Sequence, residues 1–128
     1  MDNFSYLAVL VGAMAFYFLG AAWYTFMFRK PWMADMGIDP ATPRQAPGPS
    51  ALVGSFAVAL VLAGAIEFIV RDAGIGFGAC RGTIVGIAIA AVMAQNALYD
   101  TRPKRLWVIN GGYALVGAAI VGIIAGAL

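Results

Sequence analysis

Few side chains in this sequence can do chemistry, and one carboxylate stands out among them. Glu67 is the only acidic residue within a long apolar stretch, and Arg71 follows it four residues later. An ionisable group inside a membrane helix is a candidate proton or cation site. The same spacing also suits an i,i+4 ion pair whose charged ends reach the membrane surface. We favour the ion pair, because Glu67 lies about one turn from the end of its apolar stretch.

Two asparagines form the second candidate site. Asn96 and Asn110 stand on either side of the short basic segment 100–105, each about one helical turn inside an apolar stretch. A tight turn makes the two stretches antiparallel neighbours, so their amides can hydrogen-bond to each other within the membrane. A polar mouth for a small ligand is the functional alternative, and we favour the structural hydrogen bond.

Other kinds of chemistry lack the residues that they need. The sequence contains no histidine, which is the commonest metal ligand and the usual general base at neutral pH. Its single cysteine, Cys80, can form neither an internal disulfide nor a thiolate metal cluster. We can assemble no nucleophile–base pair, so we expect no enzyme activity and no cofactor. The net charge of +2 is too small to indicate nucleic-acid binding.

The elements that position these residues are predicted to be membrane helices. Of 128 residues, 62% are hydrophobic and 11% are charged, whereas a soluble domain has about a quarter charged residues. Four apolar stretches each have the roughly 20 residues that cross a bilayer. They cover about residues 4–28, 51–70, 82–99 and 106–127. The sequence therefore predicts an all-α integral membrane protein, a single domain over residues 1–128 with four transmembrane helices in a compact bundle.

The connections between these stretches predict the orientation. Residues 29–50 hold five of the six prolines, which exclude a continuous helix there. Residues 71–81 form a glycine-rich connection and residues 100–105 a tight turn. Six of the eight basic residues, Arg44 among them, lie in the first and third connections. Because basic loops stay in the cytoplasm, we expect loop 29–50 to be cytoplasmic and both termini to lie on the other side.

The ends of the first and third stretches share an aromatic and basic pattern. A shift of 75 residues aligns Tyr24, Arg29, Lys30 and Trp32 with Tyr99, Lys104, Arg105 and Trp107. This pattern fits two parallel helix-hairpin repeats, and it equally fits the ordinary flanks of membrane helices. In both cases we expect contacts with lipid or with a protein partner from Trp23, Tyr24, Arg29, Lys30, Trp32, Arg102, Lys104, Arg105 and Trp107.

Small residues recur every four positions in three of the stretches. Such ridges let helix backbones approach closely inside lipid, where water does not drive association. The ridges are Ala51, Ser55, Ala59 and Ala63; Gly78, Gly82, Gly86, Ala90 and Ala94; and Ala114, Ala118, Gly122 and Gly126. We expect Gly82, Gly86 and Gly122 to lie at helix–helix contacts in a bundle with little room for a cofactor.

Two groups of residues resemble the signatures of a known family. Segments 102–103 (RP) and 106–113 (LWVINGGY) resemble the C-terminal signature of small bacterial membrane proteins grouped as domain of unknown function 1761. Segments 20–24 (GAAWY) and 30–33 (KPWM), with Gly37, are similar to its N-terminal signature, and 96–99 (NALY) to the segment before its Arg-Pro. The resemblance covers nearly the whole chain.

The chain also departs from that pattern. Arg29 stands where the family has glycine before the lysine, and the proline-rich part of loop 29–50 is not a family feature. The resemblance implies a four-helix protein of the bacterial cytoplasmic membrane. It brings no established activity and no site residues.

We weigh three roles for such a protein. The one that we favour is a non-enzymatic structural or accessory subunit, which contacts the lipid bilayer and either a larger membrane complex or a second copy. The alternative is a small dimeric transporter or channel that uses Glu67 and the Asn96/Asn110 pair, and a membrane enzyme comes last. A transporter places Glu67 in an interior cavity, whereas a structural role places it at the interface beside Arg71 or Arg81.

Overall fold

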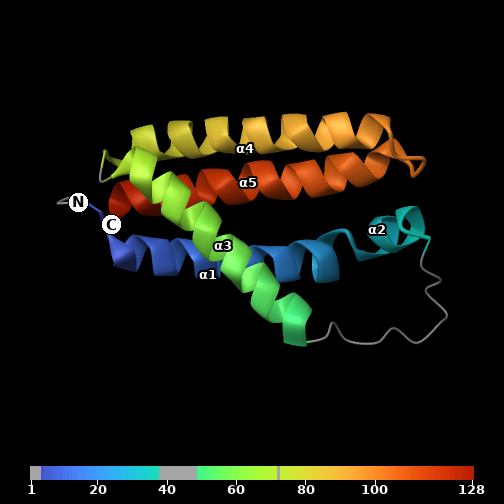
Figure 1. Ribbon diagram of the computed structural model, residues 1–128, viewed down its shortest axis with the longest axis horizontal. Coiled ribbons are helices and arrows are strands. Elements are labelled where there is room, and N and C mark those ends of the chain that lie inside the picture. Colours follow the sequence, from blue (N-terminus) through green and yellow to red (C-terminus); the bar gives the residue numbers. More distant parts are fainter. Residues whose placement is uncertain (1–3, 38–48, 72) are drawn as a thin grey trace.

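A computed structural model describes residues 4–37, 49–71 and 73–128, and within these ranges it contains helices and no strand. Helix α1 leads directly into a short π-helical segment, η1, and α2 follows after one residue (Figure 1). In chain order the elements are α1 (Tyr6–Ala22), η1 (Trp23–Met27), α2 (Arg29–Asp35), α3 (Pro49–Val70), α4 (Ile75–Leu98) and α5 (Lys104–Ala127).

Four helical segments are long and apolar enough to cross a membrane. They are Tyr6–Met27, Pro49–Val70, Ile75–Leu98 and Lys104–Ala127, and they pack together. The predicted all-α fold with four membrane helices is therefore confirmed. The first of them starts at a side-chain cap, because Ser5 Oγ accepts a hydrogen bond from the Ala8 backbone N–H at 3.0 Å.

The third membrane helix begins earlier than predicted. Helix α4 starts at Ile75, so most of the expected connection 71–81 is helical. Glycine inside a helix usually costs about 1 kcal/mol. Here the close contact of Gly78 with Gly122 of α5 offsets that cost. The remaining turn includes Gly74, whose φ of +100° is one that glycine adopts without strain.

Loop 29–50 is only partly described. Its first seven residues form α2, and its last two, Pro49 and Ser50, begin α3. Residues 38–48, which include Arg44 and three of the five prolines of the loop, lie outside the described residues.

Helix α5 lies at the centre of the arrangement. Helices α4 and α5 run antiparallel and side by side, α1 lies along α5, and α3 crosses both α1 and α5 diagonally (Figure 1). The two halves of the chain thus pack differently, although their sequences share the tyrosine, basic and tryptophan pattern. The α3–α4 turn lies at the end of the bundle where α1 begins, and α2 lies at the other end with the α4–α5 turn.

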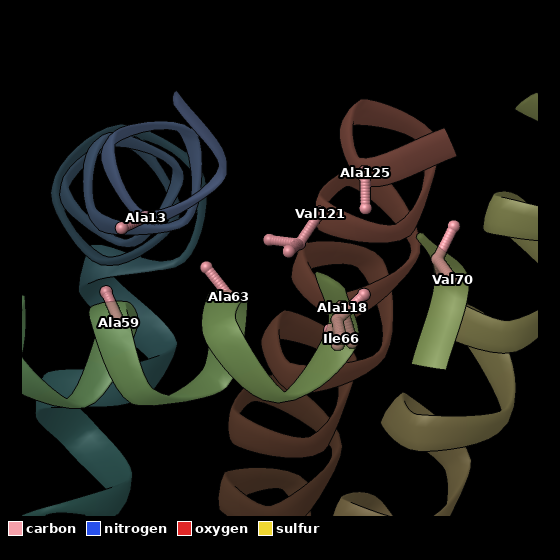
Figure 2. Packing of buried hydrophobic residues seen from close by; sticks show 8 residues of the cluster. All are labelled: Ala13, Ala59, Ala63, Ile66, Val70, Ala118, Val121 and Ala125. Atoms are coloured by element: carbon pink, nitrogen blue, oxygen red, sulfur yellow. The ribbon is translucent and has the colours of Figure 1, made fainter. Parts of the chain in front are cut away.

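Small side chains fill the core where α3 crosses α1 and α5. The buried cluster consists of Ala13, Ala59, Ala63, Ile66, Val70, Ala118, Val121 and Ala125 (Figure 2). A Cβ placed on Gly12 would lie 3.2 Å from Val121 Cγ1 and 3.6 Å from Ala63 Cβ. The first half of α3 diverges from this crossing, and Leu52, Val53 and Val58 are exposed there.

Candidate functional site

Aromatic residues connect α1 and η1 to α5 through hydrogen bonds. Trp23 Nε1 donates to the Ile109 carbonyl oxygen at 2.9 Å, and the Tyr24 hydroxyl donates to Asn110 Oδ1 at 2.7 Å. In the opposite direction, the Tyr113 hydroxyl of α5 donates to the Phe16 carbonyl oxygen at 2.8 Å. Inside a bilayer no water competes for these groups, so the three bonds hold α1 and η1 against α5.

Two glycines make room for these rings. A Cβ on Gly20 would lie 2.8 Å from the Tyr113 hydroxyl oxygen, and one on Gly112 would lie 3.2 Å from Trp23 Cζ2. The rings of Tyr24 and Tyr113 meet edge to face with their centroids 5.5 Å apart. The N-terminal and C-terminal signature segments therefore interlock as one structure.

The bond from Tyr24 to Asn110 gives a testable prediction. We expect Tyr24→Phe to lower the free energy of unfolding by about 1 kcal/mol, the range for one hydrogen bond between membrane helices. The matched control is Tyr99→Phe, since Tyr99 occupies the equivalent place in the second half and is 86% exposed. Equal stability of the two variants in detergent unfolding would contradict the role assigned to the Tyr24 hydroxyl.

A second connection joins α2 to the start of α5. Arg105 Nε and Nη2 donate to the two carboxylate oxygens of Asp35, each at 2.8 Å, and Asp35 is only 6% exposed. Such bidentate pairs are geometrically specific. Arg105 was expected to contact lipid or a partner, whereas Asp35 was not singled out. No local pattern marks Asp35, because its partner is 70 residues away.

The Asp35–Arg105 pair predicts a response to acid. The hydrogen bonds from Arg105 lower the pKa of Asp35 below its ordinary value of 3.8. A lowered folded-state pKa means that the pair stabilises the fold above the ordinary value, and that this contribution disappears as the pH falls through the lowered one. We expect the wild-type protein to lose stability below about pH 4 and Asp35→Asn to lose less, because only Asp100, whose pKa is also lowered, still contributes. Arg105→Gln should reduce the loss by the same amount, and equal losses in all three proteins would contradict the prediction.

The turn between α4 and α5 is held by its own charges. Arg102 donates from Nε and Nη2 to Asp100, the latter at 2.6 Å. These bonds lower the pKa of Asp100 to about 2. Lys104 Nζ donates to the Ala97 carbonyl oxygen near the C-terminal end of α4. A cation there interacts favourably with the negative end of the helix dipole.

The other predicted interfacial residues have varied surroundings. Trp107 Nε1 donates to the Ala90 carbonyl oxygen of α4 at 3.0 Å. The ring of Trp32 lies edge to face with that of Tyr24 at 5.7 Å. Arg29 and Lys30 are exposed at the start of α2.

A cavity of about 710 Å³ opens between α1, η1, α2, the first half of α3, and α5. Its lining combines aromatic and apolar side chains with polar ones, and includes Tyr17, Phe18, Tyr24, Trp32, Met36, Leu52, Ser55, Arg102, Asn110 and Tyr113. Pockets of this size and mixed character are typical of small-molecule sites. This cavity is the candidate site, because signature residues from both halves of the chain surround it.

The two asparagines come together in a different way from that predicted. Asn96 and Asn110 line a smaller cavity of about 170 Å³ under the α4–α5 turn. Asn110 Oδ1 accepts its hydrogen bond from Tyr24, and the expected bond between the two amides is absent. Asn96 is exposed instead. Tyr24, and not Asn96, bonds to Asn110, because η1 lies against α5 at the level of Asn110.

The predicted interfacial ion pair of Glu67 with Arg71 is wrong. Glu67 is 0% exposed, and its Oε1 accepts a hydrogen bond from the Ser5 backbone N–H at 2.9 Å. Its Oε2 has no hydrogen-bond partner within the described residues. The physical reason is that the start of α1 packs over the end of α3 and covers the carboxylate.

The neighbouring arginines serve other contacts. The Arg71 guanidinium lies over the Phe68 ring at 4.3 Å, and Arg81 Nη1 donates to the Ile69 carbonyl oxygen at 2.7 Å. Across the described ranges, no group of three or more potential ligand residues is placed to hold a metal ion.

The glycine ridges of α4 and α5 face each other along the whole pair. A Cβ on Gly78 would overlap the Gly122 carbonyl oxygen, one on Gly82 the Ala118 carbonyl oxygen, and one on Gly86 would lie 2.8 Å from Leu115 Cα. The ridge of α3 is used only in part. Ala59 and Ala63 are buried, whereas Ala51 and Ser55 are exposed, because the first half of α3 diverges from the bundle.

Comparison with known proteins identifies the family alone. No curated protein and no solved structure matches the chain. A family model described as "Protein of unknown function (DUF1761)" matches residues 7–126. This range contains both signatures and every helix, apart from Tyr6 at the start of α1 and Ala127 at the end of α5. Both signatures thus lie within one family match, and the chain belongs to the DUF1761 family.

Proposed function

We propose that this protein is a non-enzymatic structural or accessory subunit of the bacterial cytoplasmic membrane. It packs there against a larger membrane complex or against a second copy of itself. The observation that supports this role is the use of the polar signature groups within the bundle. Trp23, Tyr24 and Tyr113 all direct their hydrogen-bond donors to other parts of the same chain. Groups bonded in this way stabilise a scaffold and are not placed to act on a substrate.

The surface leaves room for a partner helix. Helix α5 is central. Of its most apolar 18-residue stretch, 44% is buried inside the protein, compared with 17% for the corresponding stretch of α4. Helix α4 packs mainly on α5, and its outer face exposes Ile84, Ile87 and Val92. A partner that covers this face would complete the burial of α4.

The proposed orientation places both termini outside the cytoplasm. Arg29, Lys30, Arg102, Lys104 and Arg105 gather at the end that holds α2 and the α4–α5 turn, as the positive-inside rule requires of a cytoplasmic end. In a Cys80→Ser background, a cysteine added after Leu128 should react with a membrane-impermeant maleimide in intact cells. Labelling only after cell lysis would reverse the orientation.

Gentle extraction tests the structural role. The protein should be extracted at native expression in a mild detergent and analysed by size and mass spectrometry, and two differently tagged copies should be co-expressed. We expect either a larger complex of constant composition or co-purification of the two tags. A lone monomer in both experiments would contradict the proposal.

Transport is the second candidate, and one observation favours it, because the structural role places Glu67 at the interface and the residue is buried instead. Glu67 is completely buried with one carboxylate oxygen unpartnered, as a proton- or cation-binding carboxylate would be. Against it, Asn96 and Asn110 lie beside the α4–α5 turn, at the opposite end of the bundle. Proton and cation flux into liposomes that is lost in Glu67→Gln would favour transport over the structural role.

A further inference from the structure

We propose that the protein binds one anionic phospholipid in a groove that runs between α1 and the first half of α3 and reaches η1 and α5, with the headgroup at Arg102. The groove consists of the 710 Å³ cavity and an adjoining cavity of about 440 Å³. Tyr17, Phe18 and Leu52 line both, so the two are continuous. One end of the groove is polar and the other is apolar, so the two ends match the headgroup and the acyl chains of a phospholipid.

The polar end is rich in hydrogen-bond donors. Arg102 uses Nε and Nη2 for Asp100, whereas its Nη1 meets only the Met36 thioether sulfur, a weak acceptor, at 2.9 Å. Asn110 receives the Tyr24 hydroxyl on Oδ1, which leaves its amide NH₂ group as a donor. No acidic residue is among the described residues of the lining, which also includes Ser55. A phosphate group, which only accepts hydrogen bonds when ionised, complements such a set.

Charge at this end favours an anionic headgroup. The described residues there include five basic side chains and two carboxylates, Asp35 and Asp100. Each carboxylate is already paired with an arginine. The excess of positive charge includes Arg29, Lys30 and Lys104, and basic side chains near the membrane surface attract anionic lipid.

The groove is about as long as one leaflet of the bilayer is thick. Met14, Val53 and Phe56 line the second cavity, and Met14 precedes Tyr24 by ten residues along α1 and η1. At 1.5 Å per residue the groove extends about 15 Å, which is half of the roughly 30 Å hydrocarbon core. An acyl chain from the leaflet next to Arg102 fits this length. A partner helix would cross the whole bilayer, which is about twice the length of this groove.

Lipid titration of the delipidated protein tests the proposal. Phosphatidylglycerol should raise the melting temperature in detergent by about 4 °C or more, and phosphatidylcholine with the same acyl chains should not. Native mass spectrometry should retain one phosphatidylglycerol per chain. Equal effects of the two lipids, or no retained lipid, would overturn the proposal.

Two pairs of variants locate the site. Arg102→Gln should weaken phosphatidylglycerol binding about tenfold, whereas Arg81→Gln, at the other end of the bundle, should not.

Ser55→Leu should fill the groove and abolish the lipid-dependent shift. Its control is Gly64→Leu, on the same helix, where a Cβ would meet no atom within 4 Å. Comparing the two lipids within each variant separates binding from any change in basal stability. Unchanged lipid binding in Arg102→Gln and Ser55→Leu would overturn the proposal, as would a change of oligomeric state alone in Ser55→Leu.

Discussion

Replacing Gly82 with leucine should separate α4 from α5 and lower the free energy of unfolding by about 3 kcal/mol or more. A Cβ at this position would overlap the Ala118 carbonyl oxygen and would lie 2.9 Å from Gly122 Cα. Both neighbours are backbone atoms, so no side-chain rotation can relieve the overlap. Because close backbone approach is what holds helices together in lipid, the whole α4–α5 pair has to shift.

The measurement is unfolding in detergent followed by far-ultraviolet circular dichroism. Gly76→Leu is the matched control, since it adds the same side chain to the same helix at a position where a Cβ meets no atom within 4 Å. We expect Gly76→Leu to unfold like the wild-type protein. Wild-type stability of Gly82→Leu would show that the two backbones do not approach as described.

Replacing Glu67 with alanine should lower the free energy of unfolding by about 2 kcal/mol, from one lost hydrogen bond and the space left by a buried side chain. Glu67 Oε1 is the acceptor for the Ser5 N–H, so the variant releases the start of α1 from the end of α3. We expect hydrogen exchange to increase in the first turn of α1 before it increases elsewhere.

Glu67→Gln tests whether a hydrogen-bond acceptor alone is sufficient at this position. Glutamine keeps the shape of the side chain and one carbonyl oxygen for Ser5, and its NH₂ group replaces the unpartnered Oε2. We expect its stability to remain within about 1 kcal/mol of the wild-type value. If Glu67→Gln were as unstable as Glu67→Ala, a carbonyl oxygen at this position would not be sufficient, and the role assigned to the hydrogen bond from Ser5 would be wrong.

The number of membrane helices could be predicted from the sequence. Apolar stretches of about 20 residues have one solution in a bilayer, because every backbone polar group must be bonded within its own segment. That rule needs no knowledge of neighbours, and it identified all four membrane helices. Its weakest result was the start of α4, where glycines suggested a connection and the structure has a helix from Ile75. Glycine favours a loop by local propensity, and only the contact with α5 reverses that preference.

The candidate site could be predicted only in part. Tyr24, Asn110 and Arg102 were singled out by residue type, and all three line the same cavity. The sequence suggested Asn96 as the partner of Asn110 because the two flank one turn. Tyr24 took that place because η1 lies against α5, a contact between residues 86 positions apart.

What the sequence determined by itself is thus the membrane location, the helical class and the residues with unusual chemistry. The tertiary structure decided which of those residues meet. Glu67 is covered by the start of α1, Asp35 pairs with Arg105, and Tyr113 lies over Gly20. The physical reason is that hydropathy and propensity act along a single segment, whereas burial and hydrogen bonding inside lipid depend on the helix that packs alongside.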